Sequence, residues 1–387
     1  CYIFNVFYYK NLMKILFIHN SIPEYRLRFM VQLSMCCDVK YLITDRNLAS
    51  AIYGSQPQLP KELNVSFLNG RFNFRTIWNE INNNAYDIVV LPPVDDFFQY
   101  FIGRFVENIV EGKQIKIAYW SEGWQKNKLP FIKAIKKYIH RNMKLSLFSK
   151  CDLFLASGSK AVHYLQSLGI PQNKIKIAYD SSTSPSVSNC NIRLQYGLKE
   201  DAKLILFLGR LVPRKGCKYL ISAFDSIAKK DEKAILLIGG EGEDKAGCEI
   251  LVNRLGLRER IKFVGRISSS DRSSYFKEAD VFVLPSYSLG GTIEAWGLTV
   301  NESLEQGTPV VATDVVGAAY DLLDGECGIM IKERNVEELA SAISHFLHIS
   351  DKTSLSKKCI ERYHQFSVEN MAFGFYNAFK TVLNDEN

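Results

Sequence analysis

Several features that would assign a chain to a common class are missing from these 387 residues. No stretch reaches the roughly 18 uninterrupted apolar residues that a membrane-spanning helix needs. The nine cysteines form no C-x-x-C pair, which disfavours a zinc site. Their odd number and scattered positions are typical of reduced cytosolic thiols that act as small buried hydrophobic residues.

Two phosphate-binding signatures are also missing. Neither half of the chain carries G-x-G-x-x-G after its first strand-like run, and no segment follows the Walker order G-x-x-x-x-G-K-[ST]. These absences disfavour a dinucleotide site and a Walker-type nucleotide site.

What is present is an ordinary soluble composition, 47% hydrophobic and 23% charged, in a chain long enough for two domains. The chain begins with Cys1, so we expect Met13 to be the natural start and residues 1–12 to be upstream translation or an interfacial tail. The run MKILFIHN from Met13 predicts a buried first strand and not a signal peptide, since its apolar core is short and no small-residue cleavage site follows.

Both halves of the chain alternate strand-like and helix-like segments. Strands rich in Val, Ile and Leu are expected at 14–20, 39–44, 87–93, 115–120, 151–157 and 174–179, and again at 203–210, 233–240, 261–265, 280–286, 308–314 and 328–331. Helices are expected between them, for example at 217–230, 244–255 and 335–349. Apolar strands that alternate with helices predict an α/β fold, with parallel sheets covered on both faces.

The Ser-rich run DSSTSPSVSNCN, residues 180–191, predicts a linker between the halves. We therefore expect an N-terminal domain at 13–180, a linker at 181–202 and a C-terminal domain at 203–364. A terminal helix in 365–387 is expected to cross back to the N-terminal domain and to pack at the domain junction.

Charge is concentrated in one segment. Net charge is +7, yet residues 123–151 hold no Asp or Glu and carry eight basic side chains, namely Lys126, Lys128, Lys133, Lys136, Lys137, Arg141, Lys144 and Lys150. Helical spacing of apolar residues in 130–150 leaves either a docked helix with a solvated basic face or a surface that binds anionic lipid. A nucleic-acid interface is disfavoured, because no stacking platform accompanies the charges.

The loop FLGRLVPRKG, residues 207–216, follows the first strand of the second half. Gly209 permits a tight turn beside a ligand, and Arg210 and Lys215 place two cations close together, both expected to be exposed. The loop is either an ordinary basic surface loop or an anion site.

The run GTIEAWGLTVNESLEQG, residues 291–307, places Glu294 before a short predicted helix and Glu302 within its first turns. Both carboxylates are expected to face one crevice. Carboxylates repel phosphate but accept hydrogen bonds from hydroxyl groups, such as those of a sugar. The alternative is that neither carboxylate binds a ligand, and that one is a solvent-exposed helix residue and the other an acidic helix cap.

The spacing from Glu294 to Glu302 resembles the E-x7-E motif of the retaining glycosyltransferases of family 4, the group 1 glycosyltransferases. Their GT-B fold has two Rossmann-like domains facing each other across a cleft. FLGRLVPRKG resembles the family's phosphate loop, and GGEGE (239–243), VGRIS (264–268), YFKEADVFVLPS (275–286) and QGTPVVATDVVGA (306–318) follow in the family's order. The likeness is specific over 203–330 and weaker at 157–179.

The resemblance implies a role for each matching residue. Arg210 and Lys215, beside Gly209, would bind the donor diphosphate, and Glu294 would bind sugar hydroxyls near the reacting carbon. The other implied donor-binding residues are Glu302 for the ribose, Arg266 and Ile267 for the base, and Trp296, Gly297, Leu298 and Thr299 for backbone contacts to sugar and phosphate. No metal and no cofactor is expected.

One departure from the family lies in the N-terminal half. Many members carry a histidine after a strand near the reaction centre, whereas IAYWSEGWQ, residues 117–125, has none. The candidates for that acceptor-side position are Glu122, Trp120 and Trp124, with His19 after the first strand as a further one.

The resemblance predicts an enzyme that transfers a sugar from a nucleotide-sugar to a saccharide or lipid-linked saccharide. We expect it at the cytoplasmic face of a membrane, bound through residues 126–150, in surface polysaccharide assembly. Two alternatives stay open: a sugar-nucleotide hydrolase or epimerase, and a non-catalytic nucleotide-sugar-binding subunit.

Overall fold

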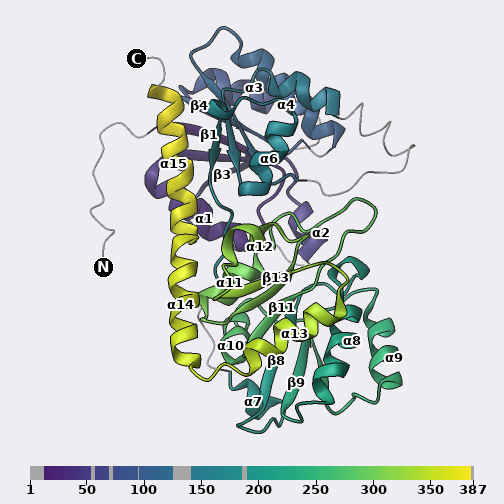
Figure 1. Cartoon of the computed structure of the whole chain (residues 1–387). Coiled ribbons are helices and arrows are strands. Elements are labelled where there is room, and N and C mark those ends of the chain that lie inside the picture. Colours follow the sequence, from purple (N-terminus) through teal and green to yellow (C-terminus); the bar gives the residue numbers. More distant parts are fainter. Residues whose placement is uncertain are drawn as a thin grey trace.

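The computed structural model describes residues 13–53, 57–68, 73–94, 96–124, 141–184 and 190–384, and it contains two parallel β-sheets, one in each half of the chain (Figure 1). The N-terminal sheet has the strand order β3-β2-β1-β4-β5-β6-β7. Its strands are β1 (Lys14–His19), β2 (Asp38–Ile43), β3 (Asn64–Phe67), β4 (Ile88–Leu91), β5 (Lys116–Ser121), β6 (Leu153–Ala156) and β7 (Ile175–Ile177).

The C-terminal sheet has the order β10-β9-β8-β11-β12-β13. Its strands are β8 (Lys203–Leu208), β9 (Ala234–Gly239), β10 (Ile261–Gly265), β11 (Val281–Leu284), β12 (Val310–Thr313) and β13 (Gly328–Ile331). The two-domain α/β fold expected from the sequence is thereby confirmed.

Helices cover both faces of each sheet. Those of the N-terminal half are α1 (Leu27–Cys36), α2 (Leu48–Tyr53), α3 (Phe74–Asn83), α4 (Phe97–Val110) and α6 (Ser159–Ser167). Those that follow are α7 (Ile192–Gln195), α8 (Cys217–Ala228), α9 (Lys245–Arg254), α10 (Arg272–Glu278), α11 (Thr299–Glu305), α12 (Gly317–Leu322), α13 (Val336–Leu347), α14 (Lys352–Gln365) and α15 (Val368–Asn384).

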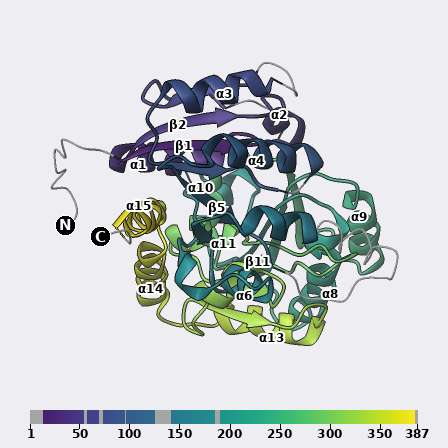
Figure 2. The same ribbon diagram turned by 90° about the horizontal axis from the view of Figure 1, so that it is seen from above.

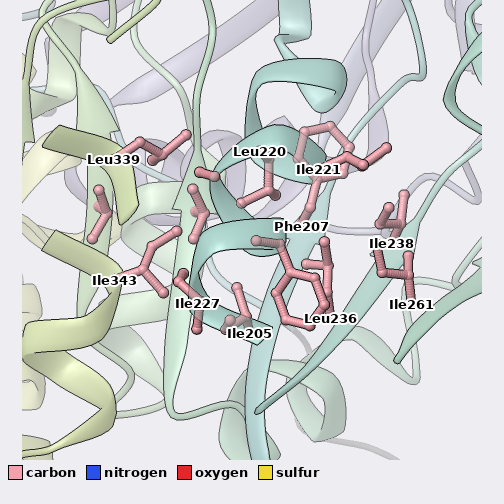
Figure 3. Close-up of a cluster of buried hydrophobic side chains, with 14 of the residues drawn as sticks. Ile205, Phe207, Leu220, Ile221, Ile227, Leu236, Ile238, Ile261, Leu339 and Ile343 are labelled. Carbon is pink, nitrogen blue, oxygen red and sulfur yellow. The ribbon is translucent and has the colours of Figure 1, made fainter. Parts of the chain in front are cut away.

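The strands are apolar on both faces because both faces are buried. In β8, Ile205 and Phe207 point to one side and pack against Leu220 and Ile221 of α8 (Figure 3). The alternate residues of β8, such as Leu206, pack in a separate cluster on the other face. A strand that is buried on both faces appears in the amino-acid sequence as a continuous hydrophobic run.

The strand order reverses once in each sheet, beside the first strand. β1 pairs with β2 on one side and with β4 on the other, and β8 pairs in the same way with β9 and β11. Open α/β sheets bind ligands in the crevice outside the carboxyl ends of the strands at such a reversal. Because β8 and β11 are neighbouring parallel strands, the loops that follow them start side by side at this end of the sheet.

The C-terminal helices return to the N-terminal domain. α14 and α15 run along one side of the molecule past both domains, and α15 lies beside α1 (Figures 1 and 2). Its buried residues Met371, Phe375 and Phe379 belong to the same core cluster as Phe17 of β1. α15 thus completes the cover of the first sheet, as the sequence predicted for a helix that crosses back.

The chain passes between the domains twice, and one buried side chain touches both passages. Asn301 of α11 donates from Nδ2 to Ser181 Oγ at 3.2 Å, in the first passage, and to the carbonyl of Phe366 at 3.2 Å, in the second. Its Oδ1 accepts a hydrogen bond from Trp296 Nε1 at 2.9 Å. The Nδ2 group of Asn301 thus connects the two passages through its hydrogen bonds.

Two parts of the fold differ from what the sequence pattern suggests. β3 was not expected, because NVSF is short, half polar and at the edge of the sheet. In the described part of 181–202, Ser181, Ser182 and Ser184 are buried and residues Ile192–Gln195 form α7. Polar composition gave no sign of this burial, since these groups are hydrogen-bonded to side chains of α11.

The packing of α15 gives a stability prediction. Phe375 is fully buried and its ring centroid lies 4.8 Å from that of Phe29 and 5.4 Å from that of Trp120. Phe375→Ala should lower the free energy of unfolding by about 3–5 kcal/mol through loss of this burial. Phe373 on the same helix is 55% exposed, and Phe373→Ala should change it by less than about 1 kcal/mol. Urea unfolding followed by tryptophan fluorescence compares the two, and equal effects would contradict the packing described.

Candidate functional site

The loop after β8 is shaped by two glycines and a tight turn. Residues Pro213–Lys215 form a 3₁₀ turn, and Gly216 at φ +74° then begins the approach to α8. A Cβ atom on Gly216 would lie 1.9 Å from the carbonyl oxygen of Pro285, so only glycine fits against the end of β11. This close approach brings the basic loop up to the segment that carries Glu294.

Glu294 is fixed by its backbone. Its N–H donates to Val315 O at 3.2 Å and its carbonyl accepts from Gly317 N at 3.1 Å, an isolated bridge beside the end of β12. Gly297 follows at φ +98°, a conformation that turns the chain into α11. The carboxylate is held in place without depending on a flexible loop.

Two cations of the basic loop bind the same oxygen of Glu294. Lys215 Nζ lies 2.6 Å and Arg214 Nη1 3.0 Å from Oε2, and Ser286 Oγ donates to it at 3.4 Å. Arg214 was not among the sequence candidates, although it sits beside Lys215 in the run PRK. Lys215, expected to be exposed, has a side chain only 12% exposed because Glu294 draws it inward.

Arg210 lies at the surface, as expected. Together with Arg214 and Lys215 it makes this loop strongly basic around one buried carboxylate. Burial alone would raise the pKa of Glu294, but Lys215 and Arg214 outweigh it and hold that pKa below its ordinary value. Glu294 is therefore ionised at neutral pH.

Glu302 has different partners. It is buried in the first turn of α11, where Oε1 accepts from Ser182 Oγ at 3.2 Å and Oε2 lies 2.7 Å from Arg272 Nη2. Glu302 thus pairs with Arg272, whereas Glu294 pairs with Lys215 and Arg214. Arg272 carried no motif, so the sequence gave no signal for its contact with Glu302.

The remaining donor-side candidates lie after β10 and at the start of α11. Arg266 is exposed after β10, and Ile267 packs over the end of β9, where a Cβ atom on Gly239 would lie 2.6 Å from Ile267 Cδ1. The side chain of Trp296 is buried in the core, so that only its backbone is available to a ligand. Leu298 and Thr299 lie at the start of α11.

In the N-terminal domain a buried arginine organises the acceptor-side candidates. Arg26 Nη2 donates to Glu122 Oε1 at 2.6 Å and to Asp180 Oδ2 at 2.9 Å. Its guanidinium carbon lies 4.6 Å from the centre of the Trp120 ring, which is itself buried. Neither Arg26 nor Asp180 was a sequence candidate; the run PEYR after the first strand offered no known motif.

The other acceptor-side candidates differ from Glu122 in their accessibility to solvent and in their hydrogen-bond partners. His19 is half-buried, with Nδ1 2.8 Å from Ser21 O, and loss of solvation lowers its pKa to about 4, so it is neutral at pH 7. The indole Nε1 of Trp124 donates to Ala295 O at 3.0 Å and to Glu294 O at 3.3 Å. Trp124 thus connects the N-terminal domain directly to the segment of Glu294, whereas Glu122 keeps a side chain 43% exposed.

Among the described residues, no group of three or more His, Cys, Asp or Glu is placed to hold a metal ion. No helix in the described ranges is long and apolar enough to cross a membrane.

The ion pairs of Glu294 give a pH prediction. A carboxylate with a lowered pKa in the folded state stabilises the fold above its unfolded pKa of about 4.3, and this stabilisation is lost as pH falls through the folded value. Wild type should therefore have a higher melting temperature than Glu294→Gln at pH 7, and the gap should narrow as the pH falls below about 4.

Glu259 provides a control, since its side chain is 95% exposed. Glu259→Gln should follow wild type at every pH. A gap between wild type and Glu294→Gln that is the same in acid and at neutral pH would rule out an ionised Glu294.

Comparison with known proteins agrees with this geometry. Residues 189–365 match the family model described as glycosyl transferases group 1. An uncharacterized glycosyltransferase of Methanocaldococcus jannaschii is 26% identical over 313 residues, which cover 78% of this chain and 76% of that protein. The D-inositol 3-phosphate glycosyltransferase of Mycobacterium marinum is 30% identical over 200 residues, half of this chain but only 41% of that protein.

A likeness of fold extends over nearly the whole chain. The crystal structure of Anabaena HepE in complex with UDP aligns with a TM-score of 0.73 at 16% identity, covering 95% of this chain and all of that one. This chain has two Rossmann-like domains, one with a seven-stranded sheet and one with a six-stranded sheet. The chain therefore has the GT-B fold, and its residues 189–365 match the family model of the group 1 glycosyl transferases.

Proposed function

We propose that the chain transfers a sugar from a nucleotide-sugar donor to a saccharide or lipid-linked saccharide acceptor, with retention of anomeric configuration. The observation that carries this proposal is the pairing of Glu294 with Lys215 and Arg214 on the loops that follow β11 and β8 of the second sheet. One loop supplies cations suited to a diphosphate, and the next supplies a carboxylate suited to sugar hydroxyls. A nucleotide-sugar has both groups side by side.

The cations would act on the leaving group. As the bond between the sugar carbon and the diphosphate oxygen breaks, negative charge grows on that oxygen, and fixed positive groups there lower the barrier. We assign this role to Arg210 and Lys215, with Arg214 as an addition from the structure. They would supply the charge that a metal ion gives in other transferases.

The other donor contacts follow the family motif. Glu294 would accept hydrogen bonds from sugar hydroxyls and Glu302 would bind the ribose, while Arg266 and Ile267 would flank the base. Backbone groups of residues 296–299 would approach the sugar and the phosphates. HepE, whose structure contains UDP, supports a nucleotide ligand for this fold.

On the acceptor side we favour Glu122. It is the partly exposed carboxylate at the end of β5, the position where the family has histidine, and Arg26 orients it. A carboxylate there would accept a hydrogen bond from the attacking hydroxyl. Trp120 is buried, a ring nitrogen of His19 is bonded to Ser21 O, and the indole of Trp124 donates to backbone carbonyls, so these three fit the role less well.

Product analysis tests the proposal against its two alternatives. The protein is incubated with donor alone and with donor plus lipid-linked saccharide. A transferase should form product only with acceptor, whereas a hydrolase would release sugar and an epimerase would convert the donor without it. A non-catalytic subunit would bind donor and leave it unchanged, and any of these last three results would refute the proposal.

We further propose that the protein works at the cytoplasmic face of a membrane in the assembly of a surface polysaccharide. The support is the basic segment 126–150, of which residues 126–140 lie outside the described part of the structure. Within the described part, Arg141 Nη2 donates to Ser167 O at 3.5 Å and Lys150 lies 3.7 Å from Glu111.

Sedimentation with anionic vesicles at low salt should carry the protein down, and high salt should release it. Absence of binding at low salt would exclude this membrane role.

The basic loop gives the sharpest mutational prediction. A charge-assisted hydrogen bond contributes roughly 1.5–3 kcal/mol, so Arg210→Ala and Lys215→Ala should each weaken nucleoside diphosphate binding about 10- to 150-fold. The loss in turnover should be larger, because charge grows on the leaving group in the transition state. The two effects should not add, since both cations act on one group.

Lys229→Ala is the matched control for this loop, because Lys229 follows α8 and its side chain is 71% exposed. It should bind and turn over like wild type. Calorimetry with the diphosphate and initial rates with the full donor measure the two effects. Near-normal transfer by both Arg210→Ala and Lys215→Ala would mean that the diphosphate binds elsewhere.

A further inference from the structure

The loop after β11 is fastened to the turn after β13. Ser288 is buried, and its N–H donates to Glu333 Oε2 at 2.6 Å while its Oγ donates to Glu333 Oε1 at 3.0 Å. Arg334 Nη2 donates to the carbonyl of Ser288 at 2.6 Å. Two neighbouring side chains of one turn therefore hold both backbone polar groups of a single residue in the other loop.

Tyr287, the residue before Ser288, is enclosed on two sides. The guanidinium carbon of Arg334 lies 4.7 Å from the centre of the Tyr287 ring, and the ring of Tyr219 on α8 meets it edge-on at a centroid distance of 5.3 Å. A guanidinium over an aromatic ring is attracted by the charge distribution of that ring. The side chain of Tyr287 is thus fixed between α8 and the turn after β13.

The backbone of Tyr287 connects this arrangement to the candidate donor site. Its N–H donates to the carbonyl of Arg214 at 2.8 Å, and Arg214 Nη1 lies 3.0 Å from Glu294 Oε2. Ser286, on the other side of Tyr287, donates from Oγ to the same carboxylate oxygen at 3.4 Å. The position of Tyr287 therefore sets the positions of two groups that contact the carboxylate of Glu294.

Arg334 makes these contacts from a strained backbone. Apart from glycines, it is the one residue in the described part of the chain with a positive φ, at +63°. This conformation crowds the Cβ atom of an L-residue, whereas glycine adopts it freely. Strain of this kind clusters at functional sites, where the surrounding contacts maintain it. Glycine would suit the turn better, so the side-chain contacts are what arginine adds at this position.

We propose that Arg334 is a positioning residue for the transfer reaction, which fixes Tyr287 and Ser288 and thereby sets Arg214 against Glu294. This inference rests on the proposed function, in which Arg214 and Glu294 act on the donor. A misplacement of about 1 Å at the reacting groups can cost on the order of 100-fold in rate. A small shift of the loop that carries Tyr287 would therefore lower turnover without unfolding the protein.

Arg334→Gly removes the side chain and relieves the backbone. Its melting temperature should stay close to that of wild type, because glycine accepts the left-handed conformation, yet its kcat should fall about 10- to 100-fold. Its affinity for nucleoside diphosphate should change by about threefold at most, since Arg210 and Lys215 stay in place. Arg334→Lys keeps a cation near Tyr287 and should recover part of the lost kcat. Lys332→Ala is the control, because Lys332 is exposed on the same turn, and it should match wild type.

A double-mutant cycle tests whether Arg334 acts through Arg214. In an Arg214→Ala background, Arg334→Gly should lower kcat by about twofold or less, since the side chain that it misplaces is already gone. A merely structural role for Arg334 would give the same loss in both backgrounds. Transfer from UDP-, GDP- and ADP-sugars to lipid-linked saccharide measures kcat, and calorimetry with UDP, GDP and ADP measures the affinities.

Amide hydrogen exchange tests the contact without the reaction. The N–H of Tyr287 should exchange about tenfold faster or more in Arg334→Gly than in wild type, because the loop opens more often when its clamp is removed. In Lys332→Ala the same N–H should exchange at the wild-type rate.

Each other outcome has a definite meaning. Wild-type kcat in Arg334→Gly, equal losses of kcat in the two backgrounds, or unchanged exchange at Tyr287 overturns the inference and leaves the proposed function standing. If wild type itself forms no product, the proposed function is refuted and the positioning role falls with it, even where exchange shows that Arg334 holds the loop.

Discussion

The site depends on the ion pair between Lys215 and Glu294. Removing one partner from a buried ion pair leaves an uncompensated charge, which is far more costly than the pair is favourable. Because one partner lies after β8 and the other after β11, the pair also fixes two loops from neighbouring strands. Arg214 and Ser286 bind the same oxygen, so the carboxylate has a defined direction before any ligand arrives. A pre-set arrangement of this kind is what electrostatic catalysis requires.

In the N-terminal domain the arrangement of charges is the reverse of that around Glu294. There a single buried cation, Arg26, holds two carboxylates and lies on an aromatic face. Asp180 uses both of its oxygens on Arg26, while Glu122 gives one and stays partly exposed. Asp180 is therefore fully buried, whereas Glu122 remains accessible to solvent.

The apolar pattern of the sequence predicted the strands that are buried on both faces. It did not predict an element that lacks such a pattern. Strands such as β8 and β12 were found because both of their faces are buried, whereas β3 was missed because an edge strand with polar residues has no such pattern. Arg210, Lys215, Glu294 and Glu302 could be named from motif spacing alone.

The partners of these residues could not be named in the same way. Arg272, Arg26 and Asp180 are brought in by tertiary packing, and nothing in the neighbouring residues distinguishes them from surface charges. The expectation that Lys215 is exposed failed for the same reason, since its burial depends on Glu294, 79 positions away. Motif spacing identifies the residues that belong to one loop. It does not predict which residues of another loop will pair with them or bury them.

The two passages of the chain between the domains have a mechanical consequence. Asp180 is held by Arg26 of one domain, and Ser181, the next residue, is held by Asn301 of the other. The second passage, at Phe366, lies against the same asparagine. A relative motion of the domains that preserves both passages is therefore a rotation about the neighbourhood of Asn301. Such a rotation would separate the indole of Trp124 from the carbonyl groups of Glu294 and Ala295.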